Sequence, residues 1–541
     1  MTDIISAMPI YAAAQAEQAF VDFYRRFTVA CEGDLDRLAV VDDQEAWTRR
    51  ELMSLANRIA NRLIENGLAK GDTVAVLAKN SNVYVALMVG TLAAGGCFVP
   101  LSGMASPETI RLMIEDCDTR FLFADPECQA LLSDLPGPLG LVEGPNQVSL
   151  GAPSEGWLGL EQWLGSVSDG SPAIAIGPDD AFNIIYSSGT TGVPKGIVHD
   201  HRMRYRNLDR FLRLGFGSDT VTMIATPLYS NTTMVAALPT VAFGGLLVVM
   251  EKFEAGKYLE LAQQYRATHT ILVPVQYQRL VSSADFARYD LSSFKLKFSS
   301  GSPLRASVIS EVMARWPGNL VEIYGMTEGG VSAMLNCAAN PAKWDSVGQP
   351  SEGCTILLID EQGRPVPQGE IGEIVGRATG MMRGYYKRLE ASVEILWHDE
   401  NGEAYYRSGD MGRFDEDGFL YVLDRKKDMI ISGGFNIFAE DLERTLLAHP
   451  DVEDAAVIAI PSERWGETPL GLVVRAAGSM LDVESLLAWA NERLGKAQRL
   501  AAIELRAELP RNPAGKLLKK ELRAPYWAAA RGQKTHQSYV A

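Results

Sequence analysis

The chain has 541 residues, of which 47% are hydrophobic and 22% charged, so it is long enough for two or three globular domains of ordinary composition. Its formal net charge of −16 argues against nucleic-acid binding, which depends on basic surfaces. Six scattered cysteines form no CxxC pair or Cys/His cluster, so we expect no cysteine-based metal framework and a reducing, cytoplasmic location.

The N-terminal part alternates apolar strands with helices. Its first residues include Asp3 and no basic segment ahead of an apolar core, so we expect no secretory signal peptide. The uncharged stretch 83–101 approaches the length of a membrane span, but Gly95 and Gly96 interrupt it, which favours a buried helix followed by a buried strand. The alternation predicts parallel sheets built from strand 72–77, helix 83–94, strand 97–101, helix 107–116 and strand 120–124.

A segment rich in glycine and hydroxyl groups, YSSGTTGVPKG at 186–196, follows a loop-rich stretch at 130–180 and a predicted strand at 182–186. Glycines let successive N–H groups turn toward phosphate oxygens, and the hydroxyls and Lys195 would add donors and a positive charge. A flexible surface loop has the same composition, so composition alone leaves both readings open. A P-loop NTPase is disfavoured, because Gly196 stands where the Walker pattern requires Ser or Thr after the lysine.

The alternation resumes beyond this segment and then changes twice. We predict strands at 220–227, 246–250 and 270–275 and helices at 234–243 and 258–267. From about residue 354, short strands with the turns 360–363 and 415–418 predict a β-rich subdomain. The last part carries predicted helices at 439–448 and 483–494 and strands at 455–460 and 470–476. The sequence therefore predicts an α/β fold, with two doubly wound lobes and a β-rich subdomain in 1–424, and a small α+β domain in 425–541.

Four further segments follow the glycine-rich one in order: YGMTE at 324–328, YRSGD at 406–410, DRKKDMIISGGFNIFAE at 424–440 and PRNPAGK at 510–516. Together the five segments resemble the signature motifs of the adenylate-forming (AMP-binding) superfamily, which includes acyl-CoA synthetases, adenylation domains of nonribosomal peptide synthetases and beetle luciferases. Ser408 replaces the threonine that is usual in the third motif. The resemblance implies an enzyme that uses ATP and Mg²⁺ to activate a carboxylic acid as an acyl adenylate.

The resemblance also implies the nucleotide-binding residues. The adenine pocket would contain 301–303 and 322–326, and Asp410 and Arg425 would bind the ribose. Taken alone, the Ser-Gly-Asp run at 408–410 is equally compatible with a simple turn. The implied nucleotide set is Ser187, Ser188, Gly189, Thr190, Thr191, Gly192, Lys195, Gly301, Ser302, Pro303, Glu322, Ile323, Tyr324, Gly325, Met326, Asp410 and Arg425.

Three catalytic roles come from the same resemblance. Thr327 would bond the α-phosphate, Glu328 would hold Mg²⁺, and Lys516 would bridge the carboxylate and the α-phosphate. Without the resemblance, Thr327–Glu328 would be better interpreted as a helix start, and Lys516 as a solvated lysine near the C-terminus. The C-terminal domain would rotate about a hinge at Lys427, and the thiol tunnel for coenzyme A would form at Ser432, Gly433 and Gly434.

The acyl pocket is implied at Tyr229, Ser230, Asn231 and Val275. Ser230 replaces a histidine found there in many aryl- and acyl-CoA synthetases, and no aspartate is present to bind an α-amino group, so an apolar acyl group is favoured. Whether the acid is aliphatic, alicyclic or aromatic stays open, as does its place in fatty-acid or aromatic-acid metabolism. His199 and His201 receive no role, because a carboxylate is already ionised at neutral pH and needs no general base.

The favoured function is a carboxylic acid–CoA ligase whose partners are a small-molecule acid, ATP and coenzyme A, with neither nucleic acid nor a membrane span. An adenylation enzyme that loads a separate carrier protein is the second reading. A third hypothesis, from a different functional class, is a non-catalytic nucleotide-binding protein. A luciferase-like oxidative enzyme is the least favoured hypothesis. The sequence does not specify the oligomeric state.

Overall fold

The computed structural model describes residues 20–133, 135, 146–187, 194–432, 435–495, 498–511 and 517–537. The chain divides into two compact units. Unit 1 comprises Met1–Thr355 and Gly376–Tyr406, and unit 2 comprises Ile356–Val375 and Arg407–Ala541. The domain boundary between residues 424 and 425 stays a prediction.

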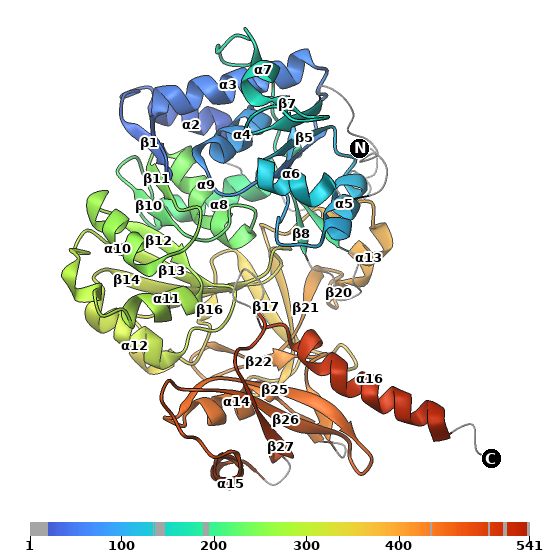
Figure 1. Cartoon of the computed structure of the whole chain (residues 1–541). Coiled ribbons are helices and arrows are strands. Elements are labelled where there is room, and N and C mark those ends of the chain that lie inside the picture. The colour runs from blue at the N-terminus through green and yellow to red at the C-terminus, as the bar shows by residue number, and fades with distance from the viewer. Residues whose placement is uncertain are drawn as a thin grey trace. The chain divides into compact units, whose positions relative to one another are not determined.

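The first sheet of unit 1 has eight strands, and its central strands are parallel (Figure 1). The stretch 130–180, predicted as loop-rich, also supplies two short strands at the sheet edge and helix α7 (Leu160–Leu164). In spatial order the strands are β19 (Gly384–Tyr385), β9 (Lys195–Asp200), β8 (Ala181–Ser187), β4 (Cys97–Pro100), β3 (Thr73–Leu77), β5 (Phe121–Ala124), β6 (Gln147–Ser149) and β7 (Leu158–Gly159).

The second sheet of unit 1 has nine strands, and the run from β1 through β11, β10, β12 and β13 to β14 is parallel. The strand predicted at 270–275 ends earlier, at Leu272, because Pro274 opens helix α11 (Pro274–Val281). The spatial order is β16 (Gln349–Pro350), β15 (Ser332–Asn336), β14 (Asn319–Gly325), β13 (Leu296–Ser300), β12 (His269–Leu272), β10 (Val221–Ile224), β11 (Leu246–Val249), β1 (Leu38–Val41) and β2 (Ala46–Thr48).

Helices flank both sheets, which confirms the two doubly wound lobes (Figure 1). One apolar core joins side chains of both sheets with helices α4 and α9. Helix α4 is apolar on every side because nearly all of it is buried there, and within the described ranges no helix is long and apolar enough to cross a membrane. The helices are α2 (Phe23–Cys31), α3 (Arg49–Glu65), α4 (Asn82–Ala93), α5 (Pro107–Asp116), α6 (Pro126–Ser133), α8 (His201–Arg213), α9 (Asn231–Ala242), α10 (Ala255–Gln264), α12 (Ala306–Arg315) and α13 (Leu389–Glu394).

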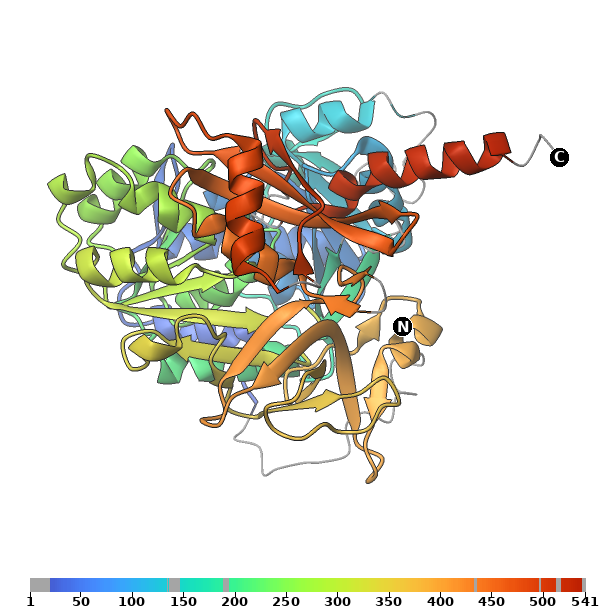
Figure 2. The ribbon, with the colours of Figure 1, turned by 90° about the horizontal axis from the view of Figure 1, so that it is seen from below.

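The predicted β-rich region and the small α+β fold are both present. A five-stranded sheet contains β17 (Cys354–Ile359), β18 (Gly372–Ala378), β20 (Leu396–His398), β21 (Ala404–Phe414) and β22 (Leu420–Arg425). In the C-terminal part of unit 2, the long strands β25 and β26 lie side by side in a separate sheet (Figure 2). Its elements are β23 (Ile430–Ser432), β24 (Phe435–Ile437), α14 (Ala439–Leu447), β25 (Val452–Ser462), β26 (Gly466–Arg475), α15 (Val483–Arg493), β27 (Ala502–Arg506) and α16 (Lys519–Gln537).

All six cysteines lie within the described residues and none forms a disulfide. Five are buried, and Cys354 is partly buried. Desolvation raises the pKa of every one of these thiols, for example to about 11 at Cys31. They therefore stay protonated and act as small apolar side chains.

Trp316 anchors an aromatic cluster in unit 1 and is only 1% exposed. We expect Trp316→Ala to lower the free energy of unfolding by about 3–5 kcal/mol, because a large buried ring leaves a cavity when it is removed. Urea titration followed by circular dichroism measures the change. Trp465, which is 48% exposed, provides the matched control, and Trp465→Ala should cost less than about 0.5 kcal/mol. Equal losses would contradict this account. The rings around Trp316 belong to Tyr258, Tyr277, Phe286 and Phe294.

Candidate active site

The glycine-rich segment connects two antiparallel strands of the eight-stranded sheet. Ser187 ends β8 and pairs with Lys195, which begins β9, so the two ends of the segment lie side by side. The Lys195 ammonium lies 5.0 Å from the centre of the Tyr385 ring, in a cation–π contact. The predicted phosphate-binding residues Ser188, Gly189, Thr190, Thr191 and Gly192 lie outside the described residues.

The YGMTE segment continues from the end of β14 toward the same tyrosine. The Tyr385 hydroxyl donates to a Glu328 carboxylate oxygen at 3.0 Å. Lys195 and Glu328, which the sequence places far apart, therefore both contact Tyr385. The sequence analysis missed Tyr385, because a lone tyrosine at the end of a short strand carries no recognisable signal.

Two glycines directly after the YGMTE segment allow the backbone there to pack closely against other parts of unit 1. Gly329 has a φ of +71°, and a Cβ there would overlap the Gly380 carbonyl oxygen. A Cβ at Gly330 would overlap the buried Tyr406 side chain. The Met382 N–H also donates to the Glu328 carbonyl at 2.8 Å, so the backbone at Glu328 is held from this side.

Thr327 is held from the other side by a buried histidine. The Thr327 carbonyl lies 2.7 Å from His199 Nε2, and His199 Nδ1 lies 2.9 Å from an Arg204 nitrogen. Burial and the neighbouring guanidinium lower the pKa of His199 well below its usual value, so the imidazole is neutral. Nε2 must then carry the proton, because a carbonyl can only accept. The sequence analysis gave His199 no role, although a histidine within the buried run GIVHD was an available signal.

The predicted adenine pocket combines the ends of neighbouring parallel strands. Ser299 and Ser300 of β13 pair with Glu322 and Ile323 of β14. Glu322 is buried and accepts the Leu304 N–H at 3.0 Å, and desolvation raises its pKa to about 8. Beyond the strands, Gly301, Pro303 and Gly325 are exposed, whereas Ser302, Tyr324 and Met326 are partly buried. The structure thus brings the two predicted adenine segments together.

The predicted acyl residues lie at the starts of two helices. Ser230 precedes α9, which begins at Asn231, and Val275 lies in the first turn of α11. The buried Tyr229 hydroxyl has no hydrogen-bond partner among the described residues, whereas the side-chain Oδ1 of Asn231 accepts from Arg204 at 3.0 Å. These helices follow β10 and β12, so the acyl and adenine segments lie at the same edge of the nine-stranded sheet, where ligands bind in open α/β sheets.

In unit 2, Asp410 of β21 pairs with Arg425 of β22, with 3.1 Å between the charged groups. Ser408 fixes this turn, because its hydroxyl donates to the Ile374 carbonyl at 2.7 Å and accepts the Asp410 N–H at 3.0 Å. Serine thus supplies the hydroxyl that the usual threonine would provide. Gly409 between them has a φ of +70°.

The predicted hinge residue Lys427 is exposed in unit 2, where Arg523 of α16 donates to its backbone carbonyl at 3.2 Å. The same arginine forms an ion pair with Asp428 at 3.0 Å. Ser432 ends β23. Gly433, Gly434 and Lys516 lie outside the described residues, so their roles stay predictions.

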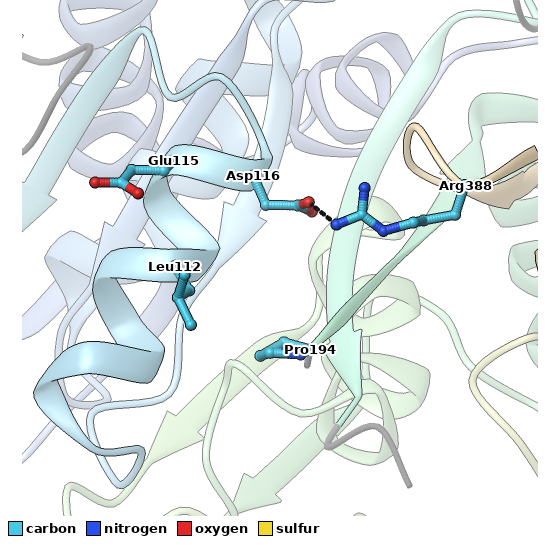
Figure 3. A pocket seen from close by; sticks show the side chains of 5 residues that line it. All are labelled: Leu112, Glu115, Asp116, Pro194 and Arg388. Atoms are coloured by element: carbon cyan, nitrogen blue, oxygen red, sulfur yellow. Dashed lines mark hydrogen bonds and ion pairs between the residues drawn. The ribbon is translucent and has the colours of Figure 1, made fainter. Parts of the chain in front are cut away.

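A cavity of about 290 Å³ lies beside Pro194, the residue before β9 (Figure 3). Arg388 and Asp116 form an ion pair at 2.6 Å in its wall, and Asp116 also accepts the Tyr186 hydroxyl at 2.8 Å. Leu112 and Glu115 complete the lining, so the cavity contains none of the predicted site residues. Asp116 therefore links Arg388 to Tyr186, the residue that opens the glycine-rich segment.

Comparisons with known proteins identify the family and the relatives that the chain resembles. The family model for the AMP-binding enzyme matches residues 27–386, and that for the AMP-binding enzyme C-terminal domain matches residues 441–516. The chain is 33% identical over 481 residues to a feruloyl-CoA synthase of Amycolatopsis sp., covering 88% of this chain and 94% of the relative. It is 31% identical over 482 residues to the indoleacetate–CoA ligase of Aromatoleum aromaticum, covering 87% and 92% of the two chains. The crystal structure of ATP-bound MatB from Rhodopseudomonas palustris superimposes with a TM-score of 0.82 at 28% identity, covering 94% of this chain and 99% of that one.

The raised pKa of the buried Glu322 predicts that the stability of the protein depends on pH. Its folded-state pKa of about 8 exceeds the unfolded value of about 4.3, so its contribution to stability is lost as pH rises between those values. Glu322→Gln keeps an acceptor for the Leu304 N–H but cannot ionise. We therefore expect the melting temperature of the variant, relative to wild type, to rise from about pH 5 to about pH 8.

Differential scanning calorimetry at several pH values tests this expectation. Glu311→Gln, at an exposed position on α12, should show a constant difference from wild type. A constant difference for Glu322→Gln as well would contradict the burial argument.

Proposed function

Because this chain belongs to the family of AMP-binding enzymes, we propose residue roles for its reaction, the ATP-dependent ligation of a carboxylic acid to coenzyme A. The chain is an AMP-forming acid–CoA ligase. It activates the acid as an acyl adenylate with release of pyrophosphate and transfers the acyl group to the thiol. The observation that supports our assignment best is that Lys195 and Glu328 both contact Tyr385.

In the first step a carboxylate oxygen attacks the α-phosphorus of ATP and pyrophosphate leaves. Two anions approach each other, so the site needs positive charge and donors where charge develops. Lys195 and the hydroxyls of the glycine-rich segment would bind the β- and γ-phosphates, and Thr327 would bond the α-phosphate. Lys516 would contact both the carboxylate and the α-phosphate and offset their repulsion.

Glu328 is our candidate for the residue that holds Mg²⁺. Magnesium is commonly held by one or two carboxylates together with substrate phosphates, rather than by a cage of protein ligands. The residues fit this mode: Glu328 is partly buried and shares the neighbour Tyr385 with Lys195, and the described ranges contain no cluster of three or more metal-binding side chains. The ion would neutralise phosphate charge in the bound nucleotide.

We assign the remaining nucleotide contacts to the other motif segments. Residues 301–303 and 322–326 would enclose adenine, and Asp410 would accept hydrogen bonds from the ribose hydroxyls while its ion pair with Arg425 orients the carboxylate. In the second step the C-terminal domain, 425–541, would rotate about Lys427. Ser432, Gly433 and Gly434 would then line the path of the thiol, since glycines leave room for a slender arm.

We propose that the acid carries an apolar or aromatic group. The partly buried Tyr229 and Val275 give the acyl segment an apolar lining with few polar groups. Two of its relatives are named for feruloyl and indoleacetate groups, both of which contain an aromatic ring. We also propose a cytoplasmic location, because all six thiols are unpaired and a reducing compartment would keep them so.

The first test measures pyrophosphate release with ATP and Mg²⁺ against a panel of aromatic, alicyclic, straight-chain and amino acids, with and without coenzyme A. We expect release to depend on an aromatic or apolar acid, and mass spectrometry to detect its CoA thioester. An adenylate that accumulates without reaching coenzyme A would instead indicate a carrier-protein acceptor. Bound ATP with no turnover of any acid would contradict the proposed reaction.

The second test separates the two half-reactions. We expect Lys516→Ala to lower adenylation by about 10²-fold or more, because a charge-stabilising contact is lost at the reacting phosphorus. Thioester formation from presynthesised acyl adenylate should stay within about threefold of wild type. Lys520→Ala, an exposed lysine four positions on, is the matched control and should leave both steps unchanged. Equal loss of both steps in Lys516→Ala would refute its assigned role.

A further inference from the structure

Arg204 of helix α8 is a buried cation with only neutral partners. Its side chain is 2% exposed, and within the described part of the chain no carboxylate forms an ion pair with it. Its hydrogen bonds go to the Asn183 oxygen at 3.0 Å, to His199 Nδ1 at 2.9 Å and to the Asn231 oxygen at 3.0 Å. Three separate elements, β8, β9 and α9, therefore converge on one guanidinium.

This arrangement costs free energy. A buried charge without an opposite charge is expensive unless hydrogen bonds replace its lost hydration. Desolvation lowers the pKa of Arg204 to about 9, so the guanidinium still carries its charge at neutral pH. An apolar side chain would fill the same space at lower cost, which suggests that the directed hydrogen bonds serve a purpose other than stability.

His199 extends the contacts of Arg204 toward the nucleotide side of the site. The guanidinium donates to Nδ1, and this fixes the tautomer in which Nε2 carries the proton. Nε2 then donates to the Thr327 carbonyl at 2.7 Å. Asn183 Nδ2 lies 3.1 Å from the same Nδ1 and restricts the ring further.

We propose that Arg204 and His199 are positioning residues for adenylation. Together they fix the predicted acid-binding residue Asn231 and the predicted phosphate-binding residue Thr327 relative to each other. Arg204 acts on the acid side by fixing the Asn231 side chain at the start of α9. It acts on the nucleotide side through His199, which fixes the backbone of Thr327. The inference rests on the proposed residue roles, because it assigns the two anchored residues to acid and phosphate binding.

Two substitutions at one position separate the two connections. In His199→Gln the amide nitrogen can still donate to the Thr327 carbonyl, but no acceptor remains near Nδ1 for Arg204. In His199→Asn the amide oxygen can still accept from Arg204, but nothing reaches the Thr327 carbonyl. Arg204→Met removes all three hydrogen bonds and keeps a long unbranched side chain. Arg213→Met, at an exposed position on the same helix, is the control.

The experiment measures KM for the acid and kcat for pyrophosphate release, together with the melting temperature. We expect His199→Gln to raise KM for the acid about tenfold with kcat within about threefold, and His199→Asn to lower kcat about tenfold with little change in KM. Arg204→Met should show both defects, and Arg213→Met neither. A purely structural role would instead lower the activity of both His199 variants in the same proportion as their melting temperatures.

Identical KM and kcat changes in the two His199 variants would overturn the proposal, and so would an Arg204→Met enzyme as active as Arg213→Met. The wild type measured in parallel separates this result from a failure of the proposed function. A wild type that turns over no acid refutes the reaction itself, whereas an active wild type with indistinguishable variants refutes only the positioning role.

Discussion

Parallel strand pairing is the constraint on which the nucleotide and acid segments of unit 1 depend. Because β10, β12, β13 and β14 are parallel neighbours, their carboxyl ends meet at one edge of the nine-stranded sheet. Segments that lie about a hundred residues apart in the sequence, such as those at Asn231 and Glu322, are therefore brought together without long connections. The glycines at 329 and 330 then let the chain beyond β14 lie against the backbone of Gly380 and the Tyr406 ring.

Charge distribution in the site follows from burial. Lys195 lies against the ring of Tyr385, whose hydroxyl donates to Glu328, whereas Arg204 has only neutral acceptors around it. Glu322, on the nine-stranded sheet, responds to burial by favouring its protonated form. Arg204 therefore keeps its charge at neutral pH, while the carboxyl of Glu322 in the predicted adenine segment is mostly protonated, which suits a site that must accept a polyanion.

Much of this arrangement was predictable from the sequence. Continuous apolar strands between helices predicted both sheets, and α4 was correctly distinguished from a membrane span because two glycines end it. Within the loop-rich stretch 130–180, β6 and β7 were not predicted, because such short edge strands leave too few residues for a periodic pattern. Strand β12 also ends at Leu272 and not at Val275 as predicted. The apolar residues continue beyond Leu272, but the proline that opens α11 ends the strand.

Within the site, the motifs identified the residues that would touch the nucleotide but not those that support them. Tyr385 and Arg204 come from segments with no motif, and only their tertiary neighbours reveal a role. Such contacts depend on how distant strands and helices meet, which local sequence does not encode.

The protonated, shielded thiols have a practical consequence. Labelling reagents attack thiolates at accessible positions, and here burial suppresses both reactivity and access. A cysteine engineered on the surface of each unit would then react well ahead of the native ones, without prior replacement of all six. Spin labels or fluorophores attached in this way could follow the separation between the units through a catalytic cycle, on an otherwise unaltered enzyme.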